Sequence, residues 1–321
     1  MTTRRDFLTV ACSAAALSAL PLAATARETV QVVGVARRAV GDIRITALLD
    51  GFVPIDAAAL TGATTEAAAA ATEAAFLNGT AVDTSINAYV IETGDRTIVV
   101  DGGTVFGPDG TPAFGPTTGK AAAAFEAAGF DADAVDTLFC THLHPDHTGF
   151  FLDATGARFK NASLALHSAE HAFWTDASNF TGADEQAQGF AAAAQAVAGA
   201  YADRLTLVED GASIAPGVDA QLMAGYTPGH AGLTINSGDD AMLIWGDIIH
   251  VGVAQFANPS WTIAFDTDQA AAAATRARVL DQVATDRLMV AGSHIDFPSF
   301  GHVGRAGDAY RFVPARWDHE V

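Results

Sequence analysis

The fold is decided by the stretch VDTLFCTHLHPDH, residues 135–147. The apolar run 135–140 predicts a buried strand. This strand delivers the chain into four polar residues within six positions: His142, His144, Asp146 and His147. Neutral imidazole nitrogens and carboxylate oxygens are ligands of divalent metal ions. Where a strand runs out into a loop, the first two histidines project the same way, whereas the last two ligands can turn the other way. Two ligand sets this close together suit two metal ions rather than one.

Three further positions have a similar context, in which a strand ends in a small residue and a ligand type follows. They are Gly229-His230, Gly246-Asp247 and Ser293-His294. Any one of them alone is more typical of a turn or of a hydrogen-bonded polar group, so the cluster at 142–147 carries the prediction of metal binding. Strand ends of a layered fold bring such side chains to one rim.

The rest of the chain alternates between short apolar runs and alanine-rich segments. The apolar runs predict strands at 30–35, 43–49, 86–92, 97–100, 135–140, 205–208, 218–224, 233–236, 241–245 and 288–290. Helical composition predicts helices at 65–76, 119–128, 167–175, 184–201 and 268–284. The strand at 43–49 is expected to end at Asp50-Gly51, which is typical of a turn. Paired strands flanked by helices in each half predict an α/β protein with two central sheets covered by helices on both faces.

The N-terminus reads as an export signal. Paired arginines at Arg4-Arg5 are followed by Phe7-Leu8, an apolar stretch and Ala24-Thr25-Ala26. This pattern resembles a twin-arginine signal peptide over residues 1–26, an ordinary secretory signal being the alternative. We therefore expect an exported, periplasmic bacterial protein whose residues 27–321 form one domain. After cleavage Cys140 is the single cysteine, so no intrachain disulfide forms, and no later segment is apolar enough to span a membrane.

The charge balance narrows the class of partner. The 321 residues include 17 lysines and arginines against 37 aspartates and glutamates, which gives a net charge of −20. A surface this negative repels nucleic acids and anionic lipids at long range. We expect a small-molecule partner and neither a nucleic acid nor a membrane.

The pattern H-x-H-x-D-H after an apolar strand resembles the metallo-β-lactamase superfamily. The resemblance extends to Asp101-Gly102-Gly103 before the cluster and to His230, Asp247 and His294 after it, and covers residues 30–310. It implies an αββα sandwich with two central mixed sheets and a two-metal site at one edge. It further implies which side chains hold each ion: His142, His144 and His230 the first, Asp146, His147 and His294 the second, with Asp247 bridging both. We expect two zinc ions, although the ligand types also fit manganese, iron or cobalt.

A narrower resemblance concerns residues 246–256 and 293–303, which look like the methyl parathion hydrolase and lactonase group. It implies a hydrolase that uses a bridging hydroxide to cleave hydrophobic lactones or aryl esters, and a homodimer as the assembly. Asp146 and Asp247 are the expected catalytic carboxylates. His250 stands where related lactonases have tyrosine, so it is either a hydrogen-bond donor to a substrate oxygen or a packing residue.

Alternative functions remain open from the sequence. The first is a phosphotriesterase with the same fold, the second an RNA-processing nuclease of the superfamily, and the third a non-catalytic binding protein. We expect Asp101 to orient the histidine loop rather than to bind metal, with Thr141 and Thr148 in similar roles. Nine aromatic residues stand near predicted rim loops, and some of them are expected to line a substrate pocket: Phe52, Phe106, Phe173, Trp174, Phe180, Phe256, Trp261, Phe297 and Phe300.

Overall fold

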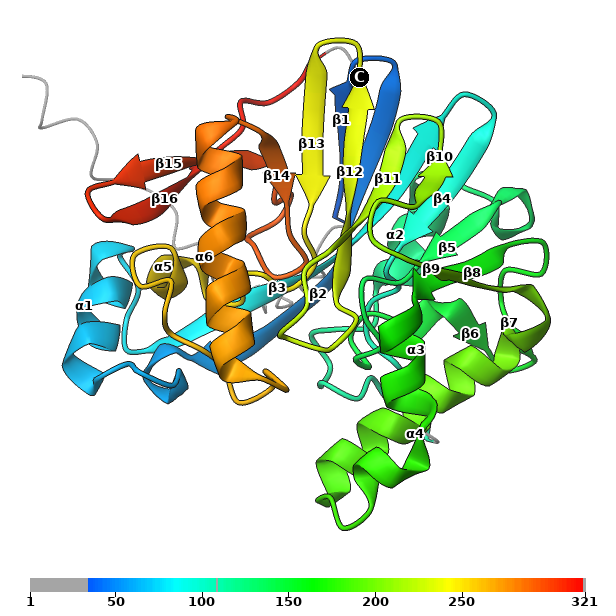
Figure 1. Cartoon of the computed structure of the whole chain (residues 1–321), viewed down its shortest axis with the longest axis horizontal. Coiled ribbons are helices and arrows are strands. Elements are labelled where there is room, and N and C mark those ends of the chain that lie inside the picture. The colour runs from blue at the N-terminus through cyan, green and yellow to red at the C-terminus, as the bar shows by residue number, and fades with distance from the viewer. Residues whose placement is uncertain (1–33, 108, 320–321) are drawn as a thin grey trace, which may run out of the picture. The chain divides into compact units, whose positions relative to one another are not determined.

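A computed structural model describes residues 34–107 and 109–319, and within them two seven-stranded mixed sheets form the centre of the fold (Figure 1). The first sheet has the order β1-β2-β3-β4-β5-β8-β9 and the second the order β10-β11-β12-β13-β14-β15-β16. The predicted export signal at 1–26 lies outside the described residues and stays a prediction, as does most of the strand expected at 30–35. None of the described helices is both long and apolar enough to span a membrane.

The first sheet is antiparallel from β1 to β4 and parallel from β4 to β9. Its strands are β1 (Val35–Val40), β2 (Ile43–Asp56), β3 (Ala81–Thr93), β4 (Arg96–Val100), β5 (Thr137–Phe139), β8 (Ser163–His167) and β9 (Leu205–Val208). A separate two-stranded sheet pairs β6 (Leu152–Asp153) with β7 (Gly156–Ala157).

The second sheet is antiparallel except for the parallel pair β13–β14. Its strands are β10 (Ser213–Ala215), β11 (Val218–Leu222), β12 (Ala231–Ser237), β13 (Asp240–Ile244), β14 (Met289–Ala291), β15 (Gly301–Ala306) and β16 (Ala309–Pro314). The helices are α1 (Thr65–Ala74), α2 (Ala121–Ala127), α3 (Ser168–Thr175), α4 (Glu185–Ala200), α5 (Gly252–Gln255) and α6 (Gln269–Thr285).

Alternating side chains on the strands divide the core into layers. On β5, Leu138 packs with Phe125 of α2, whereas its neighbour Phe139 packs between the two sheets. On β13, Ile244 joins that same central layer, whereas Leu243 packs against α6. Strands buried on both faces in this way are expected at the centre of a sandwich covered by helices. The predicted αββα architecture is therefore confirmed.

Two parts of the secondary-structure prediction are wrong. Strand β2 does not end at Asp50-Gly51 but passes through a register shift there and continues to Asp56. The Asp50 carboxylate accepts hydrogen bonds from the backbone N–H groups of Thr104, Gly119 and Ala121, so a turn-type residue stabilises a bulge instead. Strand β8 and the hairpin of β15 and β16 were not predicted, because their alternation of apolar residues is short and interrupted.

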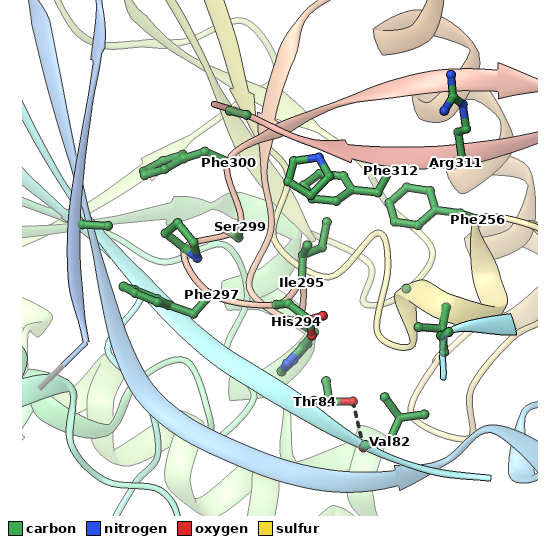
Figure 2. A pocket seen from close by; sticks show the side chains of 18 of the residues that line it. Val82, Thr84, Phe256, His294, Ile295, Phe297, Ser299, Phe300, Arg311 and Phe312 are labelled. Carbon is green, nitrogen blue, oxygen red and sulfur yellow. Dashed lines mark hydrogen bonds between the residues drawn. The ribbon is translucent and has the colours of Figure 1, made fainter. Parts of the chain in front are cut away.

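A cavity of about 560 Å³ lies between the β15–β16 hairpin, α1, α5 and the β14–β15 loop (Figure 2). Phe256, Phe297 and Phe300 line it, together with Phe312. Three of the nine aromatic residues considered from the sequence thus line this cavity, which His250 and His294 also line.

Candidate metal centre

The ends of four strands bring the histidines and aspartates to one edge of the two sheets. Cluster 142–147 follows β5, Asp247 follows β13, and His294 follows β14. His230 directly precedes β12, which is antiparallel to β13 and therefore starts at that same edge. Each ligand position lies just outside a strand, where the polar side chain is no longer part of the strand ladder.

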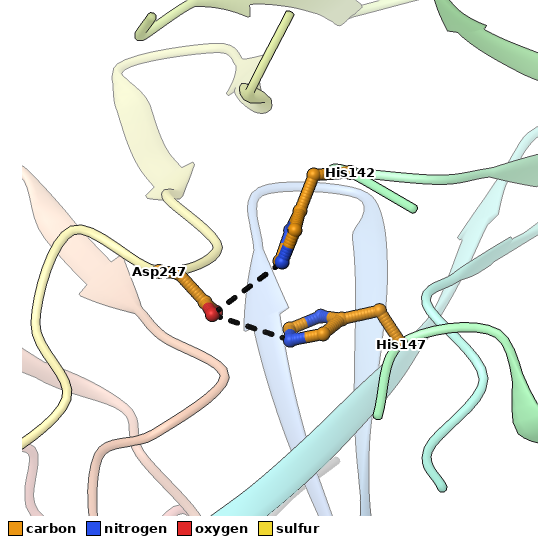
Figure 3. A group of neighbouring side chains, drawn as sticks. All are labelled: His142, His147 and Asp247. Atoms are coloured by element: carbon orange, nitrogen blue, oxygen red, sulfur yellow. Dashed lines mark ion pairs between the residues drawn. The ribbon is translucent and has the colours of Figure 1, made fainter. Parts of the chain in front are cut away.

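Asp247 lies at the centre of the cluster, as Figure 3 shows for His142 and His147, whose rings point toward its carboxylate. Its Oδ2 atom lies within ion-pair distance of four imidazole Nε2 atoms: 3.6 Å from His142, 3.3 Å from His147, 3.2 Å from His250 and 3.2 Å from His294. Asp146 lies on the other side of His147 and His294, with its Oδ2 atom 3.7 Å and 3.4 Å from their Nε2 atoms.

Three groups of these side chains place their ligand atoms within 4.8 Å of one another. They are His142–His147–Asp247, Asp146–His147–His294 and Asp247–His250–His294. His144 and His230 fall outside these groups, although their rings lie 4.7 Å and 5.4 Å from that of His142. The structure thus brings five of the seven predicted ligands together and places the remaining two at the side of His142.

The second ring nitrogen of each predicted histidine ligand is held by a hydrogen bond. The Nδ1 partners are Thr141 Oγ1 for His142, Tyr226 Oη for His144, Asp101 Oδ2 for His147, the Met223 carbonyl for His230 and the Ser85 carbonyl for His294, at 2.8–3.0 Å. These hydrogen bonds orient each ring so that its Nε2 atom faces the cluster. Metal-binding histidines are usually oriented in this way. His250 differs, because neither of its ring nitrogens has a hydrogen-bond partner among the described residues.

Unpaired buried atoms supply the test of whether a cation fits here. The Nε2 atoms of His142 and His147 and both carboxylate oxygens of Asp247 are buried and have no hydrogen-bond partner within residues 34–107 and 109–319. Buried polar atoms are normally satisfied, so this set is accounted for by ions that the lone pairs would bind. The Nε2 atom of His230 instead accepts a hydrogen bond from the Asp247 backbone N–H at 3.0 Å.

Burial and neighbouring charges shift the pKa values of the carboxylates and imidazoles in the cluster. Burial raises the pKa of Asp247, but His147, His294 and His142 outweigh it and hold the pKa well below its usual range. Burial lowers the pKa of His147, yet Asp247, Asp146 and Asp101 raise it well above the ordinary value. Burial also lowers the pKa of His144 to about 3 and raises that of Asp146. Most of the imidazoles are therefore kept neutral, the form that binds metal, beside an ionised carboxylate.

Asp101 occupies the supporting position expected from the sequence. Its carboxylate accepts hydrogen bonds from His147 Nδ1 and from both the backbone N–H and the hydroxyl of Thr141, at 2.8–2.9 Å. The residue has a φ of 59°, in the left-handed region that non-glycine residues rarely adopt. Such strain is retained where the surroundings hold it in place. Thr148 has no such role, because its hydroxyl has no partner in the described part of the chain.

A cavity of about 320 Å³ opens onto the cluster and is lined by His144, Asp146, Tyr226, His250 and His294. Its other walls are apolar: Val53, Pro54, Ile55, Ala59, Leu60, Phe114, Phe190, Ile263, Ala264 and Phe265, beside Asp56. None of the nine aromatic residues considered from the sequence lines it. The aromatic residues that line it are Phe190 of α4, Phe114 of the loop after β4 and Phe265 of the loop after α5. Nothing in the sequence around these residues indicates that they lie near the cluster.

Three supporting residues were also missed from the sequence. Tyr226 places its hydroxyl 3.0 Å from His144, and its ring lies 4.7 Å from that of His250. The buried Arg276 of α6 donates hydrogen bonds to the carbonyls of Ile248, Pro259 and Trp261, and so holds the chain that follows Asp247. Glu170 of α3 is the third, and is considered below. Of these three residues, only Tyr226 could have been found from the sequence, because it stands in the run Tyr226-Thr227-Pro228-Gly229-His230 that ends at a predicted ligand.

Solved structures of other proteins are similar to this fold. The structure of the hydrolase AbOPH of the beta lactamase superfamily is 27% identical, with a TM-score of 0.83 over 90% of this chain and 100% of that chain. AidC, a dizinc quorum-quenching lactonase in complex with a product, is 25% identical, with a TM-score of 0.82 over 89% of this chain and 99% of that chain. A probable metal-dependent hydrolase from Staphylococcus aureus, 19% identical, has the same fold at a TM-score of 0.70, over 87% of this chain and 100% of that chain.

No match is found among curated protein sequences. The family model described as the Metallo-beta-lactamase superfamily matches residues 81–294, which include every predicted metal ligand. With this match, the shared fold and the cluster around Asp247, the chain belongs to the metallo-beta-lactamase superfamily and is a metal-dependent hydrolase of that fold.

Proposed function

We propose that this protein hydrolyses uncharged, hydrophobic lactones or esters with two bound zinc ions. The observation that carries the proposal is the position of the imidazole and carboxylate cluster at the floor of an apolar cavity. The similarity to AidC, a dizinc lactonase that binds an acylated homoserine product, supports both the metal and the substrate class.

The residues that would hold the ions divide around Asp247. His142, His144 and His230 would hold one ion and Asp146, His147 and His294 the other, with Asp247 shared between them. When bound, such ions polarise a carbonyl oxygen and lower the pKa of water to near neutral.

The lining of the cavity supports an uncharged substrate. No lysine or arginine stands among the described residues that line it, whereas Asp56 and Asp146 both do. An anion that entered would leave water without gaining a cationic partner from the protein, which is costly. Phe190, with its ring 5.3 Å from that of His144, and Phe265 offer an apolar surface to an acyl chain or an aryl group instead.

Two side chains at the floor of the cavity, Asp146 and His250, have proposed roles in the chemistry. Asp146 lines the cavity and has a raised pKa through burial, so its carboxylate can accept a proton from the attacking water and return it to the leaving alkoxide. Tyr226 and His250 line the same floor. The Nε2 atom of His250 lies 3.2 Å from Asp247 Oδ2, and its Nδ1 atom has no hydrogen-bond partner among the described residues, which leaves this nitrogen for a substrate oxygen.

A comparison of substrates tests the proposal. We expect kcat/KM for an N-acyl-homoserine lactone or an aryl ester to exceed kcat/KM for an aryl phosphotriester of similar size. A preference for the phosphotriester by a wide margin would establish the second candidate function, phosphotriester hydrolysis, which a largely apolar lining without lysine or arginine also admits. Failure to hydrolyse any of the three with metal present would contradict both.

A further inference from the structure

Glu170 is a buried carboxylate that the proposed chemistry does not use. It stands in the first turn of α3 with 0% of its surface exposed, and it belongs to none of the three groups of potential metal ligands. A buried carboxylate is costly unless hydrogen bonds satisfy its oxygens. The groups that donate hydrogen bonds to the Glu170 carboxylate therefore show which parts of the chain it stabilises.

Four donors surround the carboxylate. Its Oε1 atom accepts hydrogen bonds from the Leu143 backbone N–H at 2.9 Å and from the Trp174 indole N–H at 2.7 Å. Its Oε2 atom accepts from the Thr227 hydroxyl at 2.5 Å and from the Gly229 backbone N–H at 3.1 Å. Charge-assisted hydrogen bonds of this kind are stronger than those between neutral groups.

Three of these donors belong to the two loops that carry predicted ligands. Leu143 lies between His142 and His144, and Thr227 and Gly229 lie three residues and one residue before His230. Gly229 also approaches α3 closely, because a Cβ atom added there would lie 2.1 Å from the Glu170 backbone nitrogen. One carboxylate thus joins the two loops, in addition to the backbone hydrogen bond from the Ala231 N–H to the Thr141 carbonyl at 2.9 Å.

We propose that Glu170 is a positioning residue that fixes the separation between the His142–His144 loop and the His230 loop, and thereby sets the metal affinity of the site these three histidines form. The inference rests on the proposed two-metal function. Glutamine has nearly the same shape, but its amide nitrogen is a donor and cannot accept from either loop. The substitution therefore releases one loop and leaves the Asp146–His147–His294 site in place.

Metal titration of the full chain against a chromogenic chelator, with zinc and with cobalt, tests this proposal. For Glu170→Gln we expect one of the two sites to bind about 10- to 100-fold more weakly, as for other residues that orient ligands, and the other site to keep its affinity. The absorption bands of bound cobalt should change for the weakened site alone. Thr227→Val, which removes a single donor to the carboxylate, should weaken the same site by a smaller factor.

Asp50→Asn is the matched control. Asp50 is also a buried carboxylate and accepts three backbone hydrogen bonds, from Thr104, Gly119 and Ala121, but none comes from a ligand loop. It should lower the melting temperature and leave both metal affinities unchanged. Circular dichroism shows whether each variant is folded. If Glu170→Gln is not folded, the metal affinities of Thr227→Val test the proposal instead.

Unchanged affinities in Glu170→Gln, or equal weakening of both sites, would overturn the inference. A wild-type chain that binds no metal would instead overturn the proposed function, and the two failures are distinguished because the latter appears without any substitution.

Discussion

The Asp247 carboxylate is ionised because imidazoles surround it, and not because water reaches it. Burial alone would raise its pKa, and its 1% exposure leaves no solvation to offset that effect. The compensation comes from the neighbouring imidazoles of His147, His294 and His142, which favour the carboxylate form. The same coupling raises the pKa of His147, so without metal the pair shares a proton that an incoming cation must displace.

Metal binding should therefore release protons near neutral pH. Burial is outweighed by Asp247, Asp146 and Asp101, which raise the pKa of His147 well above its ordinary value, and a metal ion binds only the neutral imidazole, so metal binding should displace a proton from this residue. The affinity should rise with pH up to that raised pKa, by about tenfold per pH unit for each proton displaced. Calorimetric titration in two buffers of different ionisation enthalpy measures the release. Binding heats that do not depend on the buffer would contradict the prediction.

His250 should affect catalysis and not metal content. Its Nδ1 atom has no acceptor among the described residues, unlike that of each predicted histidine ligand, so it is not oriented as they are. His250→Phe should keep the wild-type metal content and lower kcat by about 10- to 1,000-fold, as loss of a hydrogen bond to a developing charge does. His142→Ala is the comparison, and should lose metal and activity together. Loss of metal in His250→Phe would identify His250 as a ligand.

At the scale of elements, helices support the loops that carry the site. Arg276 of α6 is 1% exposed and donates three hydrogen bonds to carbonyls of residues 248–261. Gln255 of α5 accepts from the backbone N–H groups of His250 and Val251 and donates to Trp261. These two side chains supply hydrogen-bond partners for an irregular segment that no sheet pairs.

Arg276→Met should loosen this segment. Three carbonyls lose a charged donor, so the free energy of unfolding should fall by about 3 kcal/mol or more. Arg278→Met is the matched control, because Arg278 stands on the same helix and is exposed, and it should change the free energy by less than about 0.5 kcal/mol. Denaturant unfolding measures both. Equal effects of the two substitutions would show that the buried guanidinium does not support the segment.

The sequence predicted the elements whose signal is local. A strand followed by a ligand type was recognisable at residues 135–147, and Gly246-Asp247 and Ser293-His294 repeat the same short pattern. Glu170 and Arg276 gave no signal, because a charged residue in a helix is normally solvated and burial depends on which loops pack above it. The sequence did not indicate the aromatic wall of the 320 Å³ cavity for a related reason, since Phe114, Phe190 and Phe265 meet only after three separate segments have folded against one another.

At the scale of the molecule, charge opposes anionic substrates. The chain carries a net charge of −20, and the 320 Å³ cavity that opens onto the cluster has no cationic side chain among its described lining residues. Long-range repulsion of this kind weakens as salt is added.

Two matched aryl esters, one uncharged and one with a carboxylate on the leaving group, test the effect of this charge. The charged ester should have the lower kcat/KM at low ionic strength, and its kcat/KM should rise as salt is added, whereas that of the uncharged ester should not. An insensitive charged ester, or one hydrolysed faster than its neutral partner, would contradict the assignment of an uncharged substrate.

The central claim is that side chains from distant strand ends bind two metal ions around Asp247, and metal quantification by mass spectrometry together with hydrolysis of an acylated lactone tests it most directly. We predict two metal ions per wild-type chain, activity that chelation abolishes and zinc restores, and loss of both metal and activity in Asp247→Ala. Full hydrolysis by a metal-free chain, or by Asp247→Ala, would contradict the account.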